Sequence, residues 1–262
     1  MTDMTEALVT RTRDARDVVT LTLNRPQAFN ALSTGMLTAL QRELDALQQD
    51  ATARVLVLAA AGKAFCAGHD LKEMRAQPSL NYYQELFAQC SRMMLSLTRL
   101  PVPVIARVQG MATAAGCQLV AQCDLAVASS EARFAVSGVN LGLFCSTPGV
   151  SLARNVARKQ AFEMLVTGEF IDAAQARARG LVNRVAEPAA LDAETERLVS
   201  SILSKPRVAV ALGKELFYRQ VELGIEAAYQ AAGQAMACNM MEHTALEGVQ
   251  AFIDKRTPRW GS

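Results

Sequence analysis

Hydrophobic and polar positions follow regular patterns over the first 150 residues. Residues 18–24 alternate between apolar and polar side chains, which predicts a strand with one solvated face. After Ser33, a candidate helix cap, leucines recur at helical spacing to about Gln49 and predict an amphipathic helix. The apolar run 55–58 is typical of a strand buried on both faces.

Strands and helices continue to alternate up to about residue 150, and helical patterns dominate afterwards. Further elements are expected at residues 86–97 (helix), 102–108, 125–128 and 134–136 (strands), and 173–179, 191–203 and 208–241 (helices). Residues 62–71 are expected to form a loop, and residues 255–262 an extended tail. This pattern predicts an α/β core with a helical C-terminal part, and we divide the chain into residues 1–200 for the core and 201–262 for the helical region.

The composition excludes several classes of partner. The chain of 262 residues is 51% hydrophobic and carries a net charge of +2. It has no long run of like charges and no stretch of about 18 apolar residues, so neither nucleic acid nor a membrane is an expected partner. Six cysteines occur without a CxxC pair, and the first 17 residues contain four acids, unlike a secretory or transit peptide. These features predict a cytoplasmic protein with reduced thiols.

Several common catalytic motifs are missing from the sequence. There is no glycine-rich nucleotide loop, no GxSxG nucleophile motif and no HExxH motif. The two histidines, His69 and His243, stand outside any metal-binding pattern. We therefore expect neither a metal site nor an organic cofactor.

Two segments of small residues each connect a buried strand to a helix: GKAFCAGHDLKEM at residues 62–74 and VQGMATAAGCQL at residues 108–119. Small residues let a ligand approach the backbone, and N–H groups at a helix start are unpaired and attract negative charge. Two such turns side by side would offer two donors to one oxyanion. Spacing alone leaves this arrangement open, since strand–turn–helix corners are common.

Together these segments resemble the crotonase (enoyl-CoA hydratase/isomerase) superfamily. Further matches follow in order along the chain, at residues 24–32, 123–126, 167–173, 180–182 and 252–256. The resemblance implies a ClpP-like spiral of ββα units with a helical C-terminal trimerisation region, assembled as a homotrimer or a dimer of trimers. It also implies an acyl-CoA or enoyl-CoA thioester as the ligand, with coenzyme A as part of the substrate rather than a separate cofactor.

The same resemblance implies positions for the site. The backbone N–H groups of His69 and Ala115 would form an oxyanion hole for the thioester carbonyl. The coenzyme A moiety would lie against several short segments, the last of which can come from a neighbouring subunit: Gln27, Ala28, Ala67, His69, Asp70, Leu71, Lys72, Phe252 and Lys255. Candidates for the wall of the acyl pocket are Leu71, Met74, Leu86 and Phe144.

The chain departs from the family at both glutamates with which its hydratases activate water and protonate carbon. Gln118 stands in the place of the first, and Gly138 aligns with the second. A glutamine amide cannot take a proton at neutral pH, and a positioned acid or base contributes about 10²–10⁴-fold. We therefore expect weak or absent hydration with thioester binding retained. Residues 138–150 resemble a divergent subgroup, the enoyl-CoA hydratase domain-containing protein 3 group.

The sequence leaves the catalytic side chain open. Gln118, Asn140, Cys145 and Ser146 are candidates, and the His69 side chain either acts on the substrate or only lines the pocket. Double-bond isomerisation and thioester hydrolysis are further possible reactions. The alternative is a non-catalytic acyl-CoA-binding or regulatory subunit, because the binding turns remain while the acids are absent. RNA binding, known for one branch of the superfamily, is disfavoured, since residues 35–49 contain a single basic residue.

Overall fold

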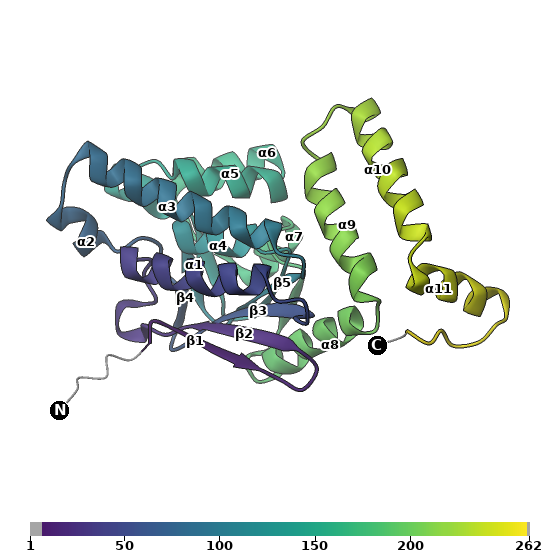
Figure 1. Ribbon diagram of the computed structural model, residues 1–262. Helices are drawn as coiled ribbons and strands as arrows, with labels where there is room; N and C mark the ends of the chain where they lie inside the picture. The colour runs from purple at the N-terminus through teal and green to yellow at the C-terminus, as the bar shows by residue number, and fades with distance from the viewer. Residues whose placement is uncertain (1–6, 261–262) are drawn as a thin grey trace.

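Two sheets of mainly parallel strands lie at the centre of the computed structural model, which describes residues 7–260 (Figure 1). The six-stranded sheet has the order β1-β2-β3-β5-β7-β10 and comprises β1 (Val9–Arg13), β2 (Val18–Leu23), β3 (Val55–Ala60), β5 (Val104–Val108), β7 (Leu125–Ser129) and β10 (Arg184–Ala186). The four-stranded sheet, in the order β4-β6-β8-β9, comprises β4 (Ala64–Cys66), β6 (Met111–Thr113), β8 (Arg133–Ala135) and β9 (Ile171–Asp172). Only the pairs β1·β2 and β8·β9 are antiparallel within these two sheets.

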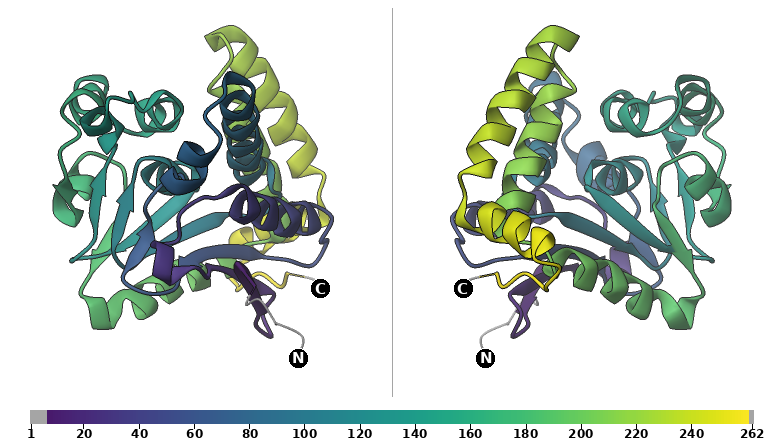
Figure 2. Two further views of the ribbon diagram at one scale, coloured as in Figure 1. Left: turned by 90° about the vertical axis from the view of Figure 1, so that its left-hand side faces the viewer. Right: turned by 90° about the vertical axis from the view of Figure 1, so that its right-hand side faces the viewer.

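Helices cover the sheets and form the C-terminal part of the chain. Those of the core are α1 (Thr34–Gln48), α2 (Leu71–Ala76), α3 (Leu80–Arg99), α4 (Ala115–Gln122), α5 (Ser146–Asn155), α6 (Arg158–Thr167), α7 (Ala173–Ala178) and α8 (Leu191–Leu203). They are followed by α9 (Arg207–Gln220), α10 (Ile225–Met240) and α11 (His243–Ile253), which stand beside the core in Figures 1 and 2. No helix in the described part of the chain has the length and hydropathy that crossing a membrane requires.

The expected ββα unit recurs along the core. Strands β3, β5 and β7 belong to the six-stranded sheet, and each is followed by a short strand of the other sheet, β4, β6 or β8. A helix then returns the chain, as α3 does after β4 and α4 does after β6. Because β4 and β6 pair in parallel, the turns that follow them leave the same edge of the sheet. The repeat therefore places the two small-residue segments next to each other.

Two apolar clusters explain why β3 is hydrophobic along its whole length. All six of its residues are buried. Leu56 and Leu58 belong to the main core, together with leucines of α1 and α3. Val55 and Val57 pack on the other side of the sheet, in a second cluster that includes Leu198 of α8. The strand is thus covered on both faces, as its apolar run predicts.

Several elements differ from the sequence expectations. The predicted loop 62–71 contains β4, and the small-residue segment at 110–121 contains β6 before its helix begins. Strands of three residues are too short for alternation to be recognised. The unexpected β1 has exposed side chains at four of its five positions, so it shows no apolar face. The helical stretch 208–241 is two helices, because a turn ending at Gly224 separates α9 from α10.

The ends of the predicted regions can also be placed. Residue 200 lies inside α8, so the predicted division of the chain after it does not coincide with the end of a helix. Residues 257–260 of the expected tail have no regular secondary structure. Residues 1–6 of the polar N-terminal segment and residues 261–262 of the tail lie outside the described residues.

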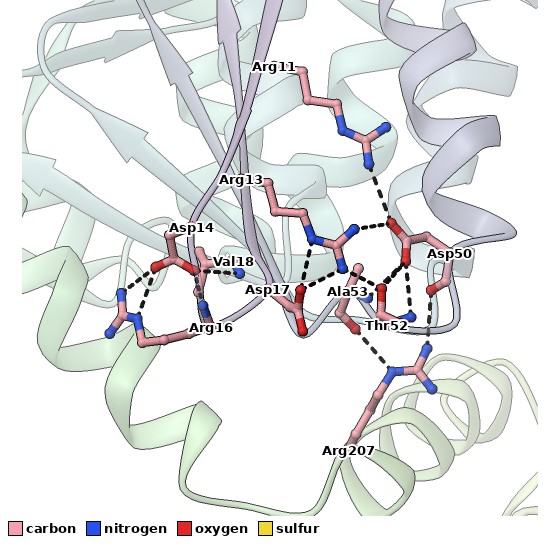
Figure 3. Close-up of polar contacts among 10 residues, drawn as sticks. All are labelled: Arg11, Arg13, Asp14, Arg16, Asp17, Val18, Asp50, Thr52, Ala53 and Arg207. Carbon is pink, nitrogen blue, oxygen red and sulfur yellow. Dashed lines mark hydrogen bonds and ion pairs between the residues drawn. The ribbon is translucent and has the colours of Figure 1, made fainter. Parts of the chain in front are cut away.

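Exposed polar contacts attach the β1–β2 hairpin to the rest of the molecule (Figure 3). The Arg13 guanidinium lies 2.9 Å from an Asp50 carboxylate oxygen, and Arg207 of α9 donates to the Ala53 carbonyl oxygen at 3.0 Å. Hydrogen bonds from the hydroxyl and the amide of Thr52 lower the pKa of Asp50 to about 2. The carboxylate therefore stays ionised at neutral pH, and the hairpin, the loop after α1 and the start of α9 are held together.

Lys214 of α9 attaches the C-terminal helices to the core. Its buried ammonium donates to the carbonyl oxygens of Leu97 and Val102 at 2.8 and 2.9 Å, and to an Asp124 carboxylate oxygen at 2.7 Å. The hydroxyl of Tyr218, also on α9, donates to the other Asp124 oxygen at 2.6 Å. Burial lowers the pKa of Lys214, and the nearby Asp124 charge opposes this shift. One buried ion pair thus joins α9 to the end of α3 and to the loops before β5 and β7.

Replacing Lys214 by Met is expected to lower the free energy of unfolding by about 3 kcal/mol, because Asp124 would be left without its partner. Urea unfolding at a fixed protein concentration measures this loss. The control Lys159→Met removes an exposed lysine of α6 and should change the free energy by less than about 0.5 kcal/mol. A loss for Lys214→Met no larger than that of the control would contradict a stabilising role for the buried pair.

Candidate active site

Two strand-to-helix turns meet where β4 and β6 pair in parallel. The first turn, after β4, is held by the Ala67 carbonyl oxygen, which accepts a hydrogen bond from the Thr113 hydroxyl at 3.0 Å. The second turn, after β6, is held by the Ala114 amide, which donates to the Ala135 carbonyl oxygen at 2.9 Å. Both turns are therefore fixed by neighbouring strands of the same sheet.

Glycine is required at two places in these turns. Gly68 has a φ of +90°, which L side chains rarely adopt, and a Cβ atom on it would lie 3.2 Å from the Ala115 nitrogen. A Cβ atom on Gly116 would lie 2.0 Å from the Cys66 carbonyl oxygen, which is far inside van der Waals contact. The two turns therefore approach each other so closely that neither glycine position has room for a side chain.

The backbone N–H groups of His69 and Ala115 flank this contact. Ala115 is the first residue of α4, so its N–H has no partner within the helix. Ala114 before it has a φ of +48°, an uncommon conformation that turns the chain sharply into the helix. Neither of the two N–H groups has a backbone acceptor among the hydrogen bonds of residues 7–260. Both are available to a ligand, and the positive end of the α4 dipole adds to their pull on negative charge.

A cavity of about 380 Å³ lies beside the two turns. Ala67 and His69 of the first turn line it, as do Ala114 and Ala115 of the second. The rest of its wall comes mainly from α2, α3 and the loop before α5, with large apolar side chains: Leu71, Met74, Phe87, Leu141, Leu143 and Phe144. Among the described residues that line it, none carries a carboxylate, an amine or a guanidinium group. The cavity suits an apolar chain with one polar end at the amides.

Three of the four expected wall residues line the cavity, namely Leu71, Met74 and Phe144. The fourth, Leu86, was wrongly placed, because it belongs to the buried core beneath α3. The next residue, Phe87, lines the cavity instead. The apolar stripe of α3 marks the side that packs on the core, so it could not show which residue faces a ligand.

The loop 137–148 supplies wall residues that sequence reasoning did not single out. They are Ser137, Leu141, Leu143, Thr147 and Pro148. Leu141 and Leu143 are 69% and 49% exposed in a single chain. The sequence shows only that these leucines stand close together, whereas their exposure, which indicates a binding site, is visible in the structure alone.

The candidate catalytic residues fall into two groups. Cys145 and Ser146 line the cavity, together with Gly138. Asn140 donates to a backbone carbonyl oxygen at 3.4 Å and does not line the cavity. Gln118 is buried in α4 outside the cavity wall, and its side-chain oxygen has no hydrogen-bond partner among the described residues.

Cys145 fills the space that a side chain at position 138 would need. A Cβ atom on Gly138 would lie 2.7 Å from the Cys145 sulfur and 2.4 Å from the Leu143 carbonyl oxygen. The Gly138 amide donates to that sulfur at 3.3 Å. Burial raises the pKa of Cys145, and the bond from Gly138 opposes the shift. The thiol is therefore protonated at neutral pH, which disfavours a nucleophilic role.

Several residues expected to contact coenzyme A come together at the start of α2. The Asp70 carboxylate caps this helix by accepting from the Lys72 amide at 3.0 Å, and it pairs with Arg25 at 2.7 Å. Arg25 directly precedes the 3₁₀ turn Pro26–Ala28, which holds two further expected contacts. The sequence did not indicate Arg25 as a site residue, because its partner Asp70 lies 45 positions away along the chain.

Phe252 and Lys255 lie elsewhere in the molecule. Phe252 is near the end of α11, and α11 and α2 lie on opposite sides of the molecule in Figure 1. The Phe252 side chain is 85% exposed. Neither residue can approach the cavity of its own chain, so a role for them in binding requires a second copy.

Comparisons with known proteins point to one family. Residues 13–262 match the model of the enoyl-CoA hydratase/isomerase family. The sequence is 48% identical to enoyl-CoA hydratase domain-containing protein 3 of Xenopus laevis, over 91% of this chain and 81% of that protein. A crystal structure of an enoyl-CoA hydratase from Mycobacterium smegmatis is 66% identical and superposes with a TM-score of 0.97, covering 98% of this chain and 100% of that one. The human enoyl-CoA hydratase domain-containing protein 3 is 44% identical with a TM-score of 0.92, covering 97% and 100%.

These findings correct one expectation and confirm another. The vertebrate relatives are named as mitochondrial proteins, which contradicts the expected cytoplasmic location. That expectation rested on unpaired cysteines and a polar first segment, and free thiols do not distinguish one reducing compartment from another. The fold is the expected α/β spiral of ββα units with helices at its C-terminal end. The chain therefore belongs to the enoyl-CoA hydratase/isomerase family, the crotonase superfamily.

Proposed function

We propose that this chain binds an acyl-CoA thioester and polarises its carbonyl oxygen with the backbone N–H groups of His69 and Ala115. The observation that carries the proposal is the close approach of the two turns, in which a Cβ atom on Gly68 would lie 3.2 Å from the Ala115 nitrogen. This approach holds two unpaired N–H groups beside one cavity. Relatives named enoyl-CoA hydratases support a thioester of coenzyme A as the ligand.

Two fixed donors suit a reaction in which charge develops on the carbonyl oxygen. When the thioester becomes an enolate or a tetrahedral intermediate, negative charge moves to this oxygen. Donors that are already in place need no reorganisation at that moment, and each is worth roughly 10²–10³-fold in rate. The apolar wall strengthens both hydrogen bonds, because it keeps water and competing charges away.

Hydration is the family reaction that this site supports least. The position of the first hydratase glutamate holds Gln118, which cannot take a proton, and that of the second holds Gly138, which has no side chain. The packing of Cys145 against Gly138 also leaves no room for a carboxylate there without movement of the loop. Isomerisation needs one base and thioester hydrolysis one activated water, so these reactions stay open. No cofactor other than the coenzyme A of the substrate enters the proposal.

A second candidate function is a non-catalytic acyl-CoA-binding or regulatory subunit. The observation that favours it is the cavity wall, which has no carboxylate among its described residues although the binding turns are intact. Such a subunit would retain its ligand without turnover. Incubation of the protein with several acyl-CoAs, followed by mass spectrometry, separates a binder from an enzyme.

We further propose that the C-terminal helices form the interface of a homotrimer or a dimer of trimers. Large apolar side chains are exposed along α9–α11 in the single chain, among them Phe217, Ile225, Tyr229, Met236, Met241 and Phe252. Large apolar side chains exposed on three successive helices favour an interface there. In such an assembly, Phe252 and Lys255 of one copy would contact the coenzyme A held by another, near Gln27, Ala28, Asp70 and Lys72.

Light scattering should give the wild-type protein a mass of three or six times the 28.2 kDa of one chain. Tyr229 is 74% exposed on α10, and Tyr229→Glu should lower this mass, because a charge would be buried in the interface. Leu80→Glu alters a similarly exposed residue of α3, 72% accessible, and should leave the mass unchanged. A wild-type protein that runs as a single chain would rule out this assembly.

Hydration of crotonyl-CoA can be measured as the loss of its enoyl absorbance. Its rate is expected to be at least about 10²-fold lower than that of a family hydratase that has both glutamates. Calorimetric titration with butyryl-CoA should nevertheless show binding. Hydration at an ordinary family rate would refute the expected loss of activity. An absence of binding to any acyl-CoA would refute the proposed function itself.

Gly116→Ala is expected to weaken butyryl-CoA binding at least about tenfold and to destabilise the fold by about 1–3 kcal/mol, because the new methyl group pushes the Cys66 carbonyl and the first turn away. Gly213→Ala makes the same change in α9, where a Cβ atom meets nothing within 4 Å. This control should keep the affinity and gain up to about 1 kcal/mol of stability. Equal affinities for both variants would contradict the importance of the close approach.

A further inference from the structure

The cavity offers few groups that can exchange a proton near neutral pH. Of the described residues that line it, His69 and Cys145 are those with a titratable side chain other than a hydroxyl. The Cys145 thiol is protonated, and its sulfur already accepts a hydrogen bond from Gly138. Elimination within the wall therefore leaves the His69 imidazole as the candidate acid or base.

The geometry of the imidazole fits such a role. Its Nδ1 lies 3.4 Å from the Leu32 carbonyl oxygen, which can only accept, so the ring proton belongs on Nδ1. Its Nε2 then carries the lone pair, and this buried atom has no partner among the described residues. The edge-to-face contact with Phe87, at 5.4 Å between ring centroids, holds the ring against the cavity wall. Nε2 is almost fully covered by protein atoms, so the ring must turn towards the cavity before this atom can meet a ligand. Such a turn would relieve the cost of a buried acceptor that has no donor.

We propose that Nε2 of His69 takes a proton from the α-carbon of the acyl-CoA bound at the two amides, and returns it. The inference rests on the proposed function, because it needs the thioester oxygen at the N–H groups of His69 and Ala115. The α-carbon is only two bonds from that oxygen, so the backbone and the side chain of one residue can act on both ends of the same enolate.

The step balances without another reactant. The C–H bond at the α-carbon breaks, and its electron pair becomes the enolate double bond while charge moves to the thioester oxygen. The proton goes to Nε2, which gives an imidazolium. Collapse of the enolate returns a proton from Nε2 to carbon, at the α position or, for an acyl chain with a double bond between its β and γ carbons, at the γ position. The second outcome is double-bond isomerisation.

The surroundings keep the imidazole neutral at physiological pH. Burial lowers the pKa of His69, whereas the Leu32 carbonyl and the Glu73 charge oppose this shift. Other ionisable or charged groups near the ring come from the turn before α2, from α3 and from the far wall of the cavity: Asp70 with its partner Arg25, Tyr82, Tyr83 and Cys145. As pH falls through the lowered pKa, the imidazole gains a proton and loses its basicity. Proton abstraction must therefore fall on the acid side and level off near neutral pH.

The test is the exchange of deuterium into the α position of butyryl-CoA in D₂O, read by mass spectrometry across a pH series. His69→Gln removes the base but keeps the backbone N–H at position 69. It should slow exchange at least about 10²-fold and abolish the acid limb, while butyryl-CoA affinity changes less than about threefold. His243→Gln, which alters the other histidine, on α11, should exchange like the wild type.

The possible outcomes distinguish a failure of the proposed proton transfer from a failure of the proposed acyl-CoA binding. If the wild type fails to bind butyryl-CoA, the proposed function fails. If it binds without exchange, or if His69→Gln exchanges at the wild-type rate, the inference fails and the binding proposal stands. Should His69→Gln not fold, the wild-type profile decides the matter: an acid limb supports the inference, and exchange that continues unchanged to pH 5 overturns it.

Discussion

Gly116 packs so closely against the Cys66 carbonyl oxygen that a single methyl group would overlap it, and this contact sets the spacing of the two turns. The parallel pairing of β4 with β6 brings the turns to one edge of the sheet. The positive φ of Gly68 then lets the first turn close over the start of α4. These backbone constraints together place His69 and Ala115 beside one cavity, where we propose that their N–H groups bind the ligand.

The cavity next to these amides has no carboxylate, amine or guanidinium group among the described residues of its wall. Under the proposed function, a ligand carbonyl would therefore meet the two N–H groups without a competing charge. The same wall contains no carboxylate among its described residues, and Cys145 fills the space that a side chain at position 138 would need. The proposed proton transfer therefore relies on the His69 imidazole, whose Nε2 has no hydrogen-bond partner in the described part of the chain.

Much of this arrangement could be predicted from the sequence, because the long elements carry strong patterns. The apolar run of β3 and the leucine spacing of α1 predict buried elements, and the small residues of two turns predict backbone exposed to a ligand. The three-residue strands β4 and β6 could not be recognised, since alternation needs a longer segment. The apolar stripe on α3 predicts that Leu86 faces the core. It could not predict that Phe87 lines the cavity, because other parts of the wall come from residues 137–148, which are distant in the sequence.

Vibrational spectroscopy measures directly whether the amides of His69 and Ala115 converge on one thioester oxygen, as we propose. Butyryl-CoA labelled with ¹³C at the thioester carbonyl would be observed free and bound by infrared or Raman difference spectra. Two hydrogen bonds to one oxygen weaken the C=O bond, so its stretching band should move to lower wavenumber in the complex. A band that stays at its position in water, or moves to higher wavenumber as in an apolar solvent, would contradict the account.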